Sequence, residues 1–267
     1  MSDVPKTDVE HHFHGVVDLG EVVGFNRPTI YVYEAPVRLW HWVNAAAIIV
    51  LAITGYLIAS PPFSLPGEAS ESNFFGNIRF THFTAGYILA IAYLMRIYWG
   101  FVGNKYGRQI FYVPLWRKTW WTGLIVEAKW YLFLRKEPQK YAGHNPLGHG
   151  AMFIISLFTA CMIVTGFALY SEAEGRDSWQ AWLFGWVFSI VPNSQDVHTL
   201  HHLGMWVIVI FAVTHIYAAI REDIMSRQTM VSTMISGERQ FRDDRRDLSD
   251  RSPPGSGARD RQHPVGR

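Results

Sequence analysis

The sequence has little cysteine and little charge, and each shortage excludes a class of protein. A single cysteine, Cys161, stands among 267 residues. This excludes an intrachain disulfide, a cysteine-ligated iron–sulfur cluster and the paired-cysteine attachment of c-type haem. Charged residues make up 17% of the chain, and the formal net charge is only +2. A nucleic-acid-binding function therefore has no electrostatic support.

The start of the sequence also lacks the pattern of a cleavable signal peptide. Residues 1–37 lack the basic start, the short apolar core and the small-residue cleavage site that such a peptide needs. We therefore expect the first apolar segment to remain in the mature protein as a spanning helix.

Hydrophobic residues, by contrast, make up 49% of the chain and are concentrated in blocks. A helix needs about 20 apolar residues to cross about 30 Å of hydrocarbon. Four blocks approach this length, which predicts an all-α integral membrane protein built as a bundle of four transmembrane helices. The predicted spans are residues 38–59, 80–102, 150–170 and 199–220.

Two further apolar stretches are predicted to lie on the membrane surface or to re-enter it. Residues 111–134 carry several charges among their tryptophans, which is typical of an amphipathic interfacial segment. Residues 181–191 are too short to span a bilayer. Neither stretch is therefore counted as a span.

Lysine and arginine are unevenly distributed between the two sides that alternating spans define. Three lie before or at the start of the first span, eight lie between the second and third, and ten follow the fourth. The opposite side has only Arg79 and Arg176. Because positive residues stay on the cytoplasmic side, both termini are predicted to be cytoplasmic.

This organisation divides the chain into three parts. Residues 1–37 form an N-terminal cytoplasmic segment, and residues 38–222 form the four-helix transmembrane domain. Residues 223–267 form a cytoplasmic tail. Because this tail has too few apolar groups to build a core, we expect it to be largely disordered.

Histidines inside the predicted spans are the strongest candidates for chemistry, because ionisable groups at membrane depth are costly and usually functional. His201 and His215 are fourteen residues apart and lie within about 40° of each other around a helix, whereas His202 is about 140° from His215. His41 opens the first span and His82 opens the second. Each histidine alone could simply bond a neighbouring helix.

The topology places these four histidines in two pairs. His41 and His215 fall near the cytoplasmic surface, and His82 and His201 fall near the outer surface. Two bis-imidazole sites would suit two six-coordinate haems stacked in a four-helix bundle, an arrangement that favours electron transfer. A protein from another class, a proton conductor or transporter with a histidine relay, is the alternative.

Several stretches resemble a known family, the b-type cytochrome subunits of membrane-bound [NiFe] hydrogenases. The resemblance covers residues 31–241 and extends to the cytochrome subunits of formate dehydrogenases. It is carried by VYEAPVRLWHWVNAAAIIVLAITGYLI, RFTHFTAGYILAIAYLMRIYWGFVGN, YAGHNPLGHGAM and HHLGMWVIVIFAVTHIYAAIREDIMS.

The resemblance implies an electron-transfer subunit of the bacterial cytoplasmic membrane. The family's haem ligands fall on His41, His82, His201 and His215, which agrees with the pairs obtained from helical phase. The implied cofactors are two haems b, and the implied partners are the small and large subunits of a [NiFe] hydrogenase and a quinone. Formate dehydrogenase or another quinone-linked dehydrogenase is the alternative partner. No cysteine cluster or nucleotide-binding loop is present, so hydrogen cleavage would belong to another chain.

Similarity to the formate dehydrogenase subunit further implies a quinone site beside the cytoplasmic haem. It would lie in the stretch YAGHNPLGHG before the third span, where Asn145, Gly148 and His149, together with His144, could bond a quinone carbonyl. The alternative is purely structural: Asn145, followed by Pro146, is a suitable helix N-cap. The sequence leaves both interpretations open.

Overall fold

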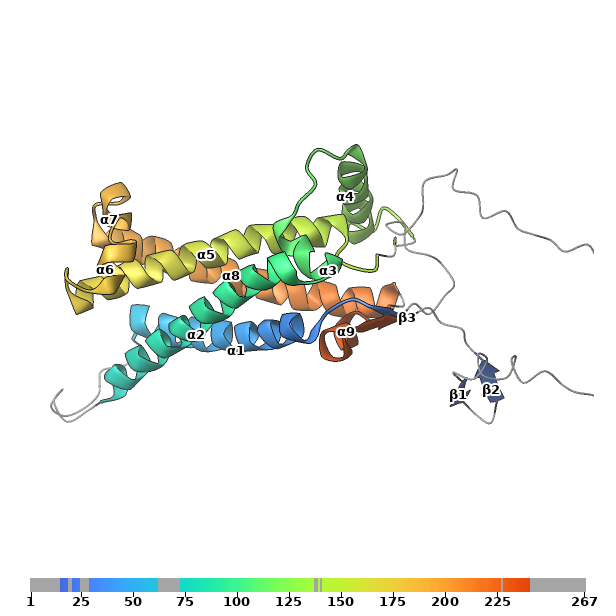
Figure 1. Ribbon diagram of the computed structural model, residues 1–267, viewed down its shortest axis with the longest axis horizontal. Helices are drawn as coiled ribbons and strands as arrows, with labels where there is room; N and C mark the ends of the chain where they lie inside the picture. The colour runs from blue at the N-terminus through green and yellow to red at the C-terminus, as the bar shows by residue number, and fades with distance from the viewer. Residues whose placement is uncertain are drawn as a thin grey trace, which may run out of the picture.

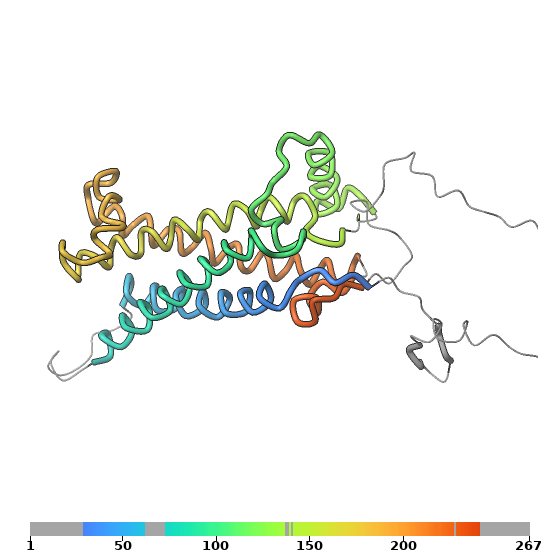
Figure 2. Tube along the Cα trace, viewed as in Figure 1, coloured from blue at the N-terminus to red at the C-terminus, as the bar shows by residue number. Residues whose placement is uncertain are grey.

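The fold is a bundle of four long helices, seen in a computed structural model. The structure describes residues 15–18, 21–24, 29–61, 73–136, 139, 141–226 and 228–240. In Figures 1 and 2 the long helices lie side by side along the longest axis of the molecule. They are α1 (Ala35–Ala59), α2 (Phe74–Val102), α5 (Pro146–Glu174) and α8 (Ser194–Met225).

All four are long and apolar enough to cross a membrane, so the four predicted spans are confirmed by length and composition. Each helix extends beyond its predicted span at one or both ends. Only 11% to 22% of the residues in their most apolar windows are buried inside the protein. Their remaining apolar side chains face outward, as expected for helices whose surroundings are lipid.

Local sequence sets several helix ends. Pro36 lies in the first turn of α1, where a missing N–H costs nothing, and the helix ends at Ala59, with Ser60 as its C-cap before Pro61. The Oδ1 atom of Asn145 accepts a hydrogen bond from the N–H of Gly148 at 2.6 Å and caps α5.

The two predicted surface stretches contain short helices. The first contains α4 (Lys118–Tyr131), and the second contains α7 (Val187–Ile190) and overlaps α6 (Trp179–Phe184). None of them is among the candidate spans of the described chain. In Figure 1, α4 stands across one end of the bundle, near the start of α5, and α6 and α7 lie at the opposite end.

The prediction of a helical membrane protein holds in its coarser form, because the fold is mostly helical and also contains two short antiparallel strand pairs. Strand β1 (Gly15–Asp18) pairs with β2 (Glu21–Gly24), and β3 (Thr29–Tyr31) pairs with β4 (Glu238–Gln240). Residues 241–267, the larger part of the predicted disordered tail, lie outside the described residues.

The first part of the predicted tail is folded against the start of the bundle. Helix α9 (Met230–Ser236) precedes β4, and the two short helical elements α3 (Lys105–Arg108) and η2 (Gln109–Phe111) lie at the same end. The carbonyl oxygens of Tyr141 and Gly143 both accept hydrogen bonds from the guanidinium of Arg239, at 2.8 and 2.7 Å. Arg239 thereby connects β4 to the segment that leads into α5.

Helix α4 is held to the bundle by buried polar contacts. Glu127 is fully buried, and its Oε2 atom lies 3.4 Å from Nδ2 of Asn145. The indole N–H of Trp130 donates to Glu222 at 3.3 Å, and Arg221 donates to the carbonyl of Trp130 at 3.2 Å. Burial, and next the nearby Glu222, raise the pKa of Glu127 to about 8.

This raised pKa predicts a pH-dependent stability. The folded protein keeps a proton on Glu127 that the unfolded chain releases above about pH 4.5, so the free energy of unfolding should fall as the pH rises from there to about 8. Glu127→Gln cannot ionise. We expect its unfolding temperature in detergent to fall less than the parent's between about pH 6 and about pH 9, with a difference of a few degrees.

The matched control is Asp177→Asn, which removes an exposed carboxylate. It should keep the parent's pH dependence. A Glu127→Gln protein whose unfolding temperature follows the parent's at every pH would show that Glu127 is not protonated in the folded protein.

Candidate functional site

The four intramembrane histidines lie in two groups, at opposite ends of the bundle. His41 on α1 and His215 on α8 face each other near the start of α1, with ring centroids 6.3 Å apart and planes tilted by 58°. The ring of Phe211 stacks on that of His215, at 5.8 Å and 6°. We call His41 and His215 the inner pair.

The other two histidines are each bonded to a threonine on a neighbouring helix. Nδ1 of His82 lies 2.9 Å from Oγ1 of Thr54 on α1, and Nδ1 of His201 lies 2.8 Å from Oγ1 of Thr165 on α5. Both contacts use Nδ1, so Nε2 of each ring is left for another partner. We call His82 and His201 the outer pair.

Glycines beside these threonines leave room for the outer imidazoles. A Cβ atom added at Gly55 would lie 3.2 Å from Cε1 of His82, and one added at Gly166 would lie 3.2 Å from Cε1 of His201. The same position at Gly55 is 3.7 Å from Sδ of Met205, one helical turn from His201 on α8. His82 and His201 are therefore brought to the same level of the bundle.

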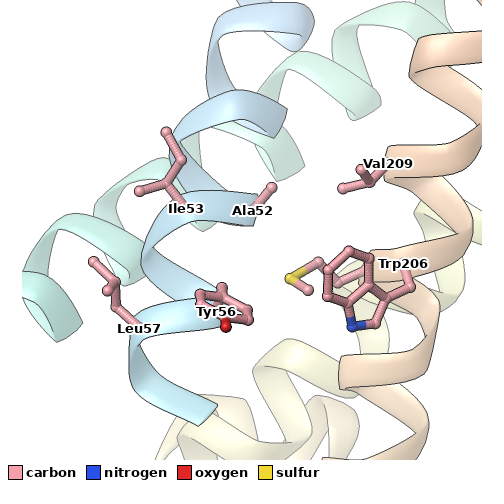
Figure 3. A pocket seen from close by; sticks show the side chains of 7 residues that line it. Ala52, Ile53, Tyr56, Leu57, Trp206 and Val209 are labelled. Atoms are coloured by element: carbon pink, nitrogen blue, oxygen red, sulfur yellow. The ribbon is translucent and has the colours of Figure 1, made fainter. Parts of the chain in front are cut away.

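An apolar groove lies between α1 and α8 (Figure 3). In the figure, Ala52 and Tyr56 on α1 face Trp206 and Val209 on α8 across this space. The groove is lined by Ala52, Ile53, Tyr56, Leu57, Met205, Trp206 and Val209. Met205, one of these lining residues, also lies close to Gly55, at the level of the outer pair.

His201 and the adjacent His202 have different partners in the structure. Nε2 of His202 accepts a hydrogen bond from the indole N–H of Trp206 at 3.2 Å, on the same helix. His202 is thus occupied along the surface of α8, whereas His201 points to α5. This agrees with the phase of about 140° that separates His202 from His215.

Buried N–H groups without a hydrogen-bond partner in the described chain collect beside the inner pair. They belong to Arg38, Trp40 and Arg96, and Nδ1 of His41 is also buried and unpartnered. The guanidinium of Arg96 lies 5.3 Å from the ring of Trp40, so these two side chains meet. Such donors suit a group that carries hydrogen-bond acceptors.

The residues predicted to bind quinone lie at the inner end and bond mainly to the protein itself. Asn145 caps α5 through Gly148, and Nε2 of His149 contacts the carbonyl oxygen of Gln109. The hydroxyl of Tyr33 lies 3.3 Å from Nδ1 of His144. The N-cap that the sequence allowed is therefore present, and a role of these residues toward a quinone stays a prediction.

The surroundings of His144 favour the uncharged form of its imidazole. Burial, followed by the positive charge of Arg239, lowers the pKa of His144 to about 3. A neutral imidazole can either donate or accept a hydrogen bond through each nitrogen, depending on its tautomer. His144 can therefore act as a donor to a carbonyl without carrying a charge.

Several of these residues were not identified from the sequence. Thr54 and Thr165 were missed, although each precedes a glycine in the same Thr-Gly-aromatic pattern, at Thr54–Tyr56 and Thr165–Phe167. That repeat was a usable signal. Trp40 was also missed, because its contact with Arg96 depends on helix packing that the sequence does not reveal.

Comparisons with known proteins identify the family of this chain. The family model described as "Prokaryotic cytochrome b561" matches residues 32–237. The chain is 64% identical over 218 residues to a protein of Bradyrhizobium diazoefficiens named "Probable Ni/Fe-hydrogenase B-type cytochrome subunit", covering 81% of this chain and 88% of the relative.

Two further relatives have corresponding names. A protein of Azotobacter vinelandii, also named "Probable Ni/Fe-hydrogenase B-type cytochrome subunit", is 58% identical over 82% of this chain and 91% of its own length. The "Probable Ni/Fe-hydrogenase 1 B-type cytochrome subunit" of Escherichia coli is 48% identical over 79% and 91%. The chain therefore belongs to the prokaryotic cytochrome b561 family, among the B-type cytochrome subunits of Ni/Fe-hydrogenases, as a multi-pass protein of the bacterial cytoplasmic membrane.

Proposed function

We propose that this chain is the membrane subunit that carries electrons from a [NiFe] hydrogenase to quinone through two haems b. His41 and His215 would hold one haem, and His82 and His201 the other. The observation that carries the proposal is the separation of four histidines into an inner and an outer pair at the two ends of one bundle. The relatives' names supply the hydrogenase.

The inner pair fits a metal shared by two imidazoles. Two rings that bind one metal ion through nitrogen bonds of about 2 Å have centroids about 6 Å apart. The centroids of His41 and His215 are 6.3 Å apart. The unpartnered N–H groups of Trp40 and Arg96 are suited to bond the carboxylates that a haem carries.

The outer pair fits a haem through different features. Thr54 and Thr165 occupy Nδ1 of His82 and His201, so Nε2 of each ring is available for iron. Gly55 and Gly166 let the two rings approach α1 and α5 closely. When bound, the haems would supply one-electron transfer between the two ends, and ligation by two histidines each would favour electron transfer over oxygen chemistry.

The direction of transfer follows from orientation, which we propose from charge. The uneven distribution of lysine and arginine favours a cytoplasmic location for both termini. The outer pair would then face a hydrogenase on the opposite side, whose small subunit would deliver electrons and whose large subunit would cleave hydrogen. Asn145, Gly148 and His149 would bind the quinone beside the inner pair.

Replacing His201 tests the outer haem. His201→Ala should remove about one of two haems per chain, because His82 alone cannot supply both axial bonds. His202→Ala is the matched control on the same helix and should keep nearly full haem, since His202 bonds only Trp206 in the described chain. Haem per protein is measured by the pyridine haemochrome assay. The reverse pattern of loss would refute the assignment.

Replacing His215 tests the order of electron transfer. In an inserted His215→Ala complex that lacks the inner haem, hydrogen should still reduce an artificial acceptor at the hydrogenase. Quinone reduction by hydrogen should fall at least about tenfold, and the outer haem should stay reduced under hydrogen.

Membrane levels of the subunit must be measured alongside, because a bound haem contributes its binding free energy to the stability of the bundle. Quinone reduction at the parent rate, in a complex confirmed to lack the inner haem, would show that the quinone does not receive electrons there. The predicted quinone site beside Asn145 would then be wrong.

A further inference from the structure

Each histidine of the outer pair is contacted by a Thr-Gly dipeptide on a neighbouring helix. Thr54–Gly55 on α1 contacts His82, and Thr165–Gly166 on α5 contacts His201. In each case the threonine hydroxyl oxygen lies within 2.9 Å of Nδ1 of the histidine. A Cβ atom added at the glycine would lie 3.2 Å from Cε1 of the same ring. We call these two dipeptides the Thr-Gly clasps.

The direction of the hydrogen bonds is fixed by the threonines themselves. The Thr54 hydroxyl donates to the carbonyl of Val50 at 2.7 Å, and the Thr165 hydroxyl donates to that of Cys161 at 2.8 Å. A hydroxyl has one hydrogen, so each oxygen can only accept from the imidazole. His82 and His201 are consequently held as the tautomer with a proton on Nδ1 and a lone pair on Nε2.

This tautomer also carries an electronic consequence. An imidazole whose Nδ1–H is bonded to an acceptor is a more basic ligand through Nε2 than one without that bond. A more basic ligand stabilises ferric over ferrous iron, so it lowers the reduction potential of a haem.

The inner pair differs in this respect. Nδ1 of His41 is buried and has no hydrogen-bond partner in the described part of the chain. Its ligand basicity is therefore not raised in the same way. The buried guanidinium of Arg96 lies near the same end, over the ring of Trp40. A positive charge there favours the reduced haem, so both features act to raise the inner potential.

We propose that Thr54 and Thr165 are positioning residues that fix the tautomer of the outer histidines and lower the potential of the outer haem below that of the inner one. The inference rests on the proposed function, because it requires both haems. A lower outer potential makes transfer from the outer to the inner end favourable, which is the direction that a hydrogenase on the outer side needs.

Removing both hydroxyls without changing side-chain shape is the direct test. In the double variant Thr54→Val, Thr165→Val, the reduction equilibrium of the outer haem should shift about tenfold toward the ferrous form, about 59 mV for one electron. Redox titration of the b-haem absorbance measures both potentials in the full complex. The outer haem is identified as the one missing from His201→Ala.

Two controls separate positioning from packing. Thr159→Val removes another buried threonine hydroxyl on α5 and should leave both potentials unchanged, because within the described residues this hydroxyl bonds only the carbonyl of Ile155 in its own helix. The variant Thr54→Ser, Thr165→Ser keeps the hydroxyls and should restore the parent potential. The electron paramagnetic resonance signal of the outer ferric haem should change in the valine variant and return in the serine variant.

The possible results test the role of the two threonines separately from the proposed function. A valine variant with both haems present and both potentials unchanged overturns the role of the threonines, as does a shift confined to the inner haem. If the valine variant loses haem, the inference requires that only the outer haem be lost and that serine restore it; loss that serine does not reverse overturns it. A parent complex with fewer than two bis-histidine haems instead contradicts the proposed function.

Discussion

The bundle depends on satisfying the nitrogens of histidines in a setting without water. A polar group buried in a membrane helix must find its partner within the protein, because hydrocarbon offers none. His82 and His201 meet this need through threonine hydroxyls on adjacent helices. Those contacts fix how α1 packs on α2 and how α5 packs on α8, because the glycine next to each threonine admits the ring.

The inner pair depends on more distant parts of the chain. His41 lies near the start of α1 and His215 near the end of α8, so their spacing is set where the chain enters and leaves the bundle. There the indole N–H of Trp42 donates to the carbonyl of Met234 at 3.0 Å, and the guanidinium of Arg38 bonds the carbonyl of Ile235. Helix α9 therefore holds the first turns of α1 from outside the bundle.

Much of the fold could be predicted because its signals are long or periodic. Four apolar blocks defined the spans, and the phase of about 40° between His201 and His215 predicted that the two residues share a face of α8. The β3–β4 pair could not be found, since three-residue strands such as Thr29–Tyr31 and Glu238–Gln240 are too short to show alternation and lie far apart in sequence. Because β4 could not be found, the predicted end of the transmembrane domain at residue 222 does not coincide with the end of the folded structure.

The site was predicted less completely, because its supporting contacts arise between helices. Nothing in the sequence fixes which threonine meets which histidine, since this depends on the rotation and register of packed helices. The contact between Arg96 and Trp40 has the same origin. Histidines are recognisable by their cost at membrane depth, whereas a threonine is common in helices and bonds its own backbone, as Thr159 does.

The two ends of the bundle also suit different chemistry. Transfer of an electron alone needs no proton path, and at the outer pair each threonine hydrogen is committed to a backbone carbonyl. Reduction of a quinone takes up protons together with electrons, so that site needs groups that hold protons. At the inner end Glu127, whose pKa burial raises to about 8, contacts Asn145, and Tyr33 contacts the neutral His144. Proton-holding groups beside the residues predicted to bind quinone are what the proposed quinone reduction at the inner end would require.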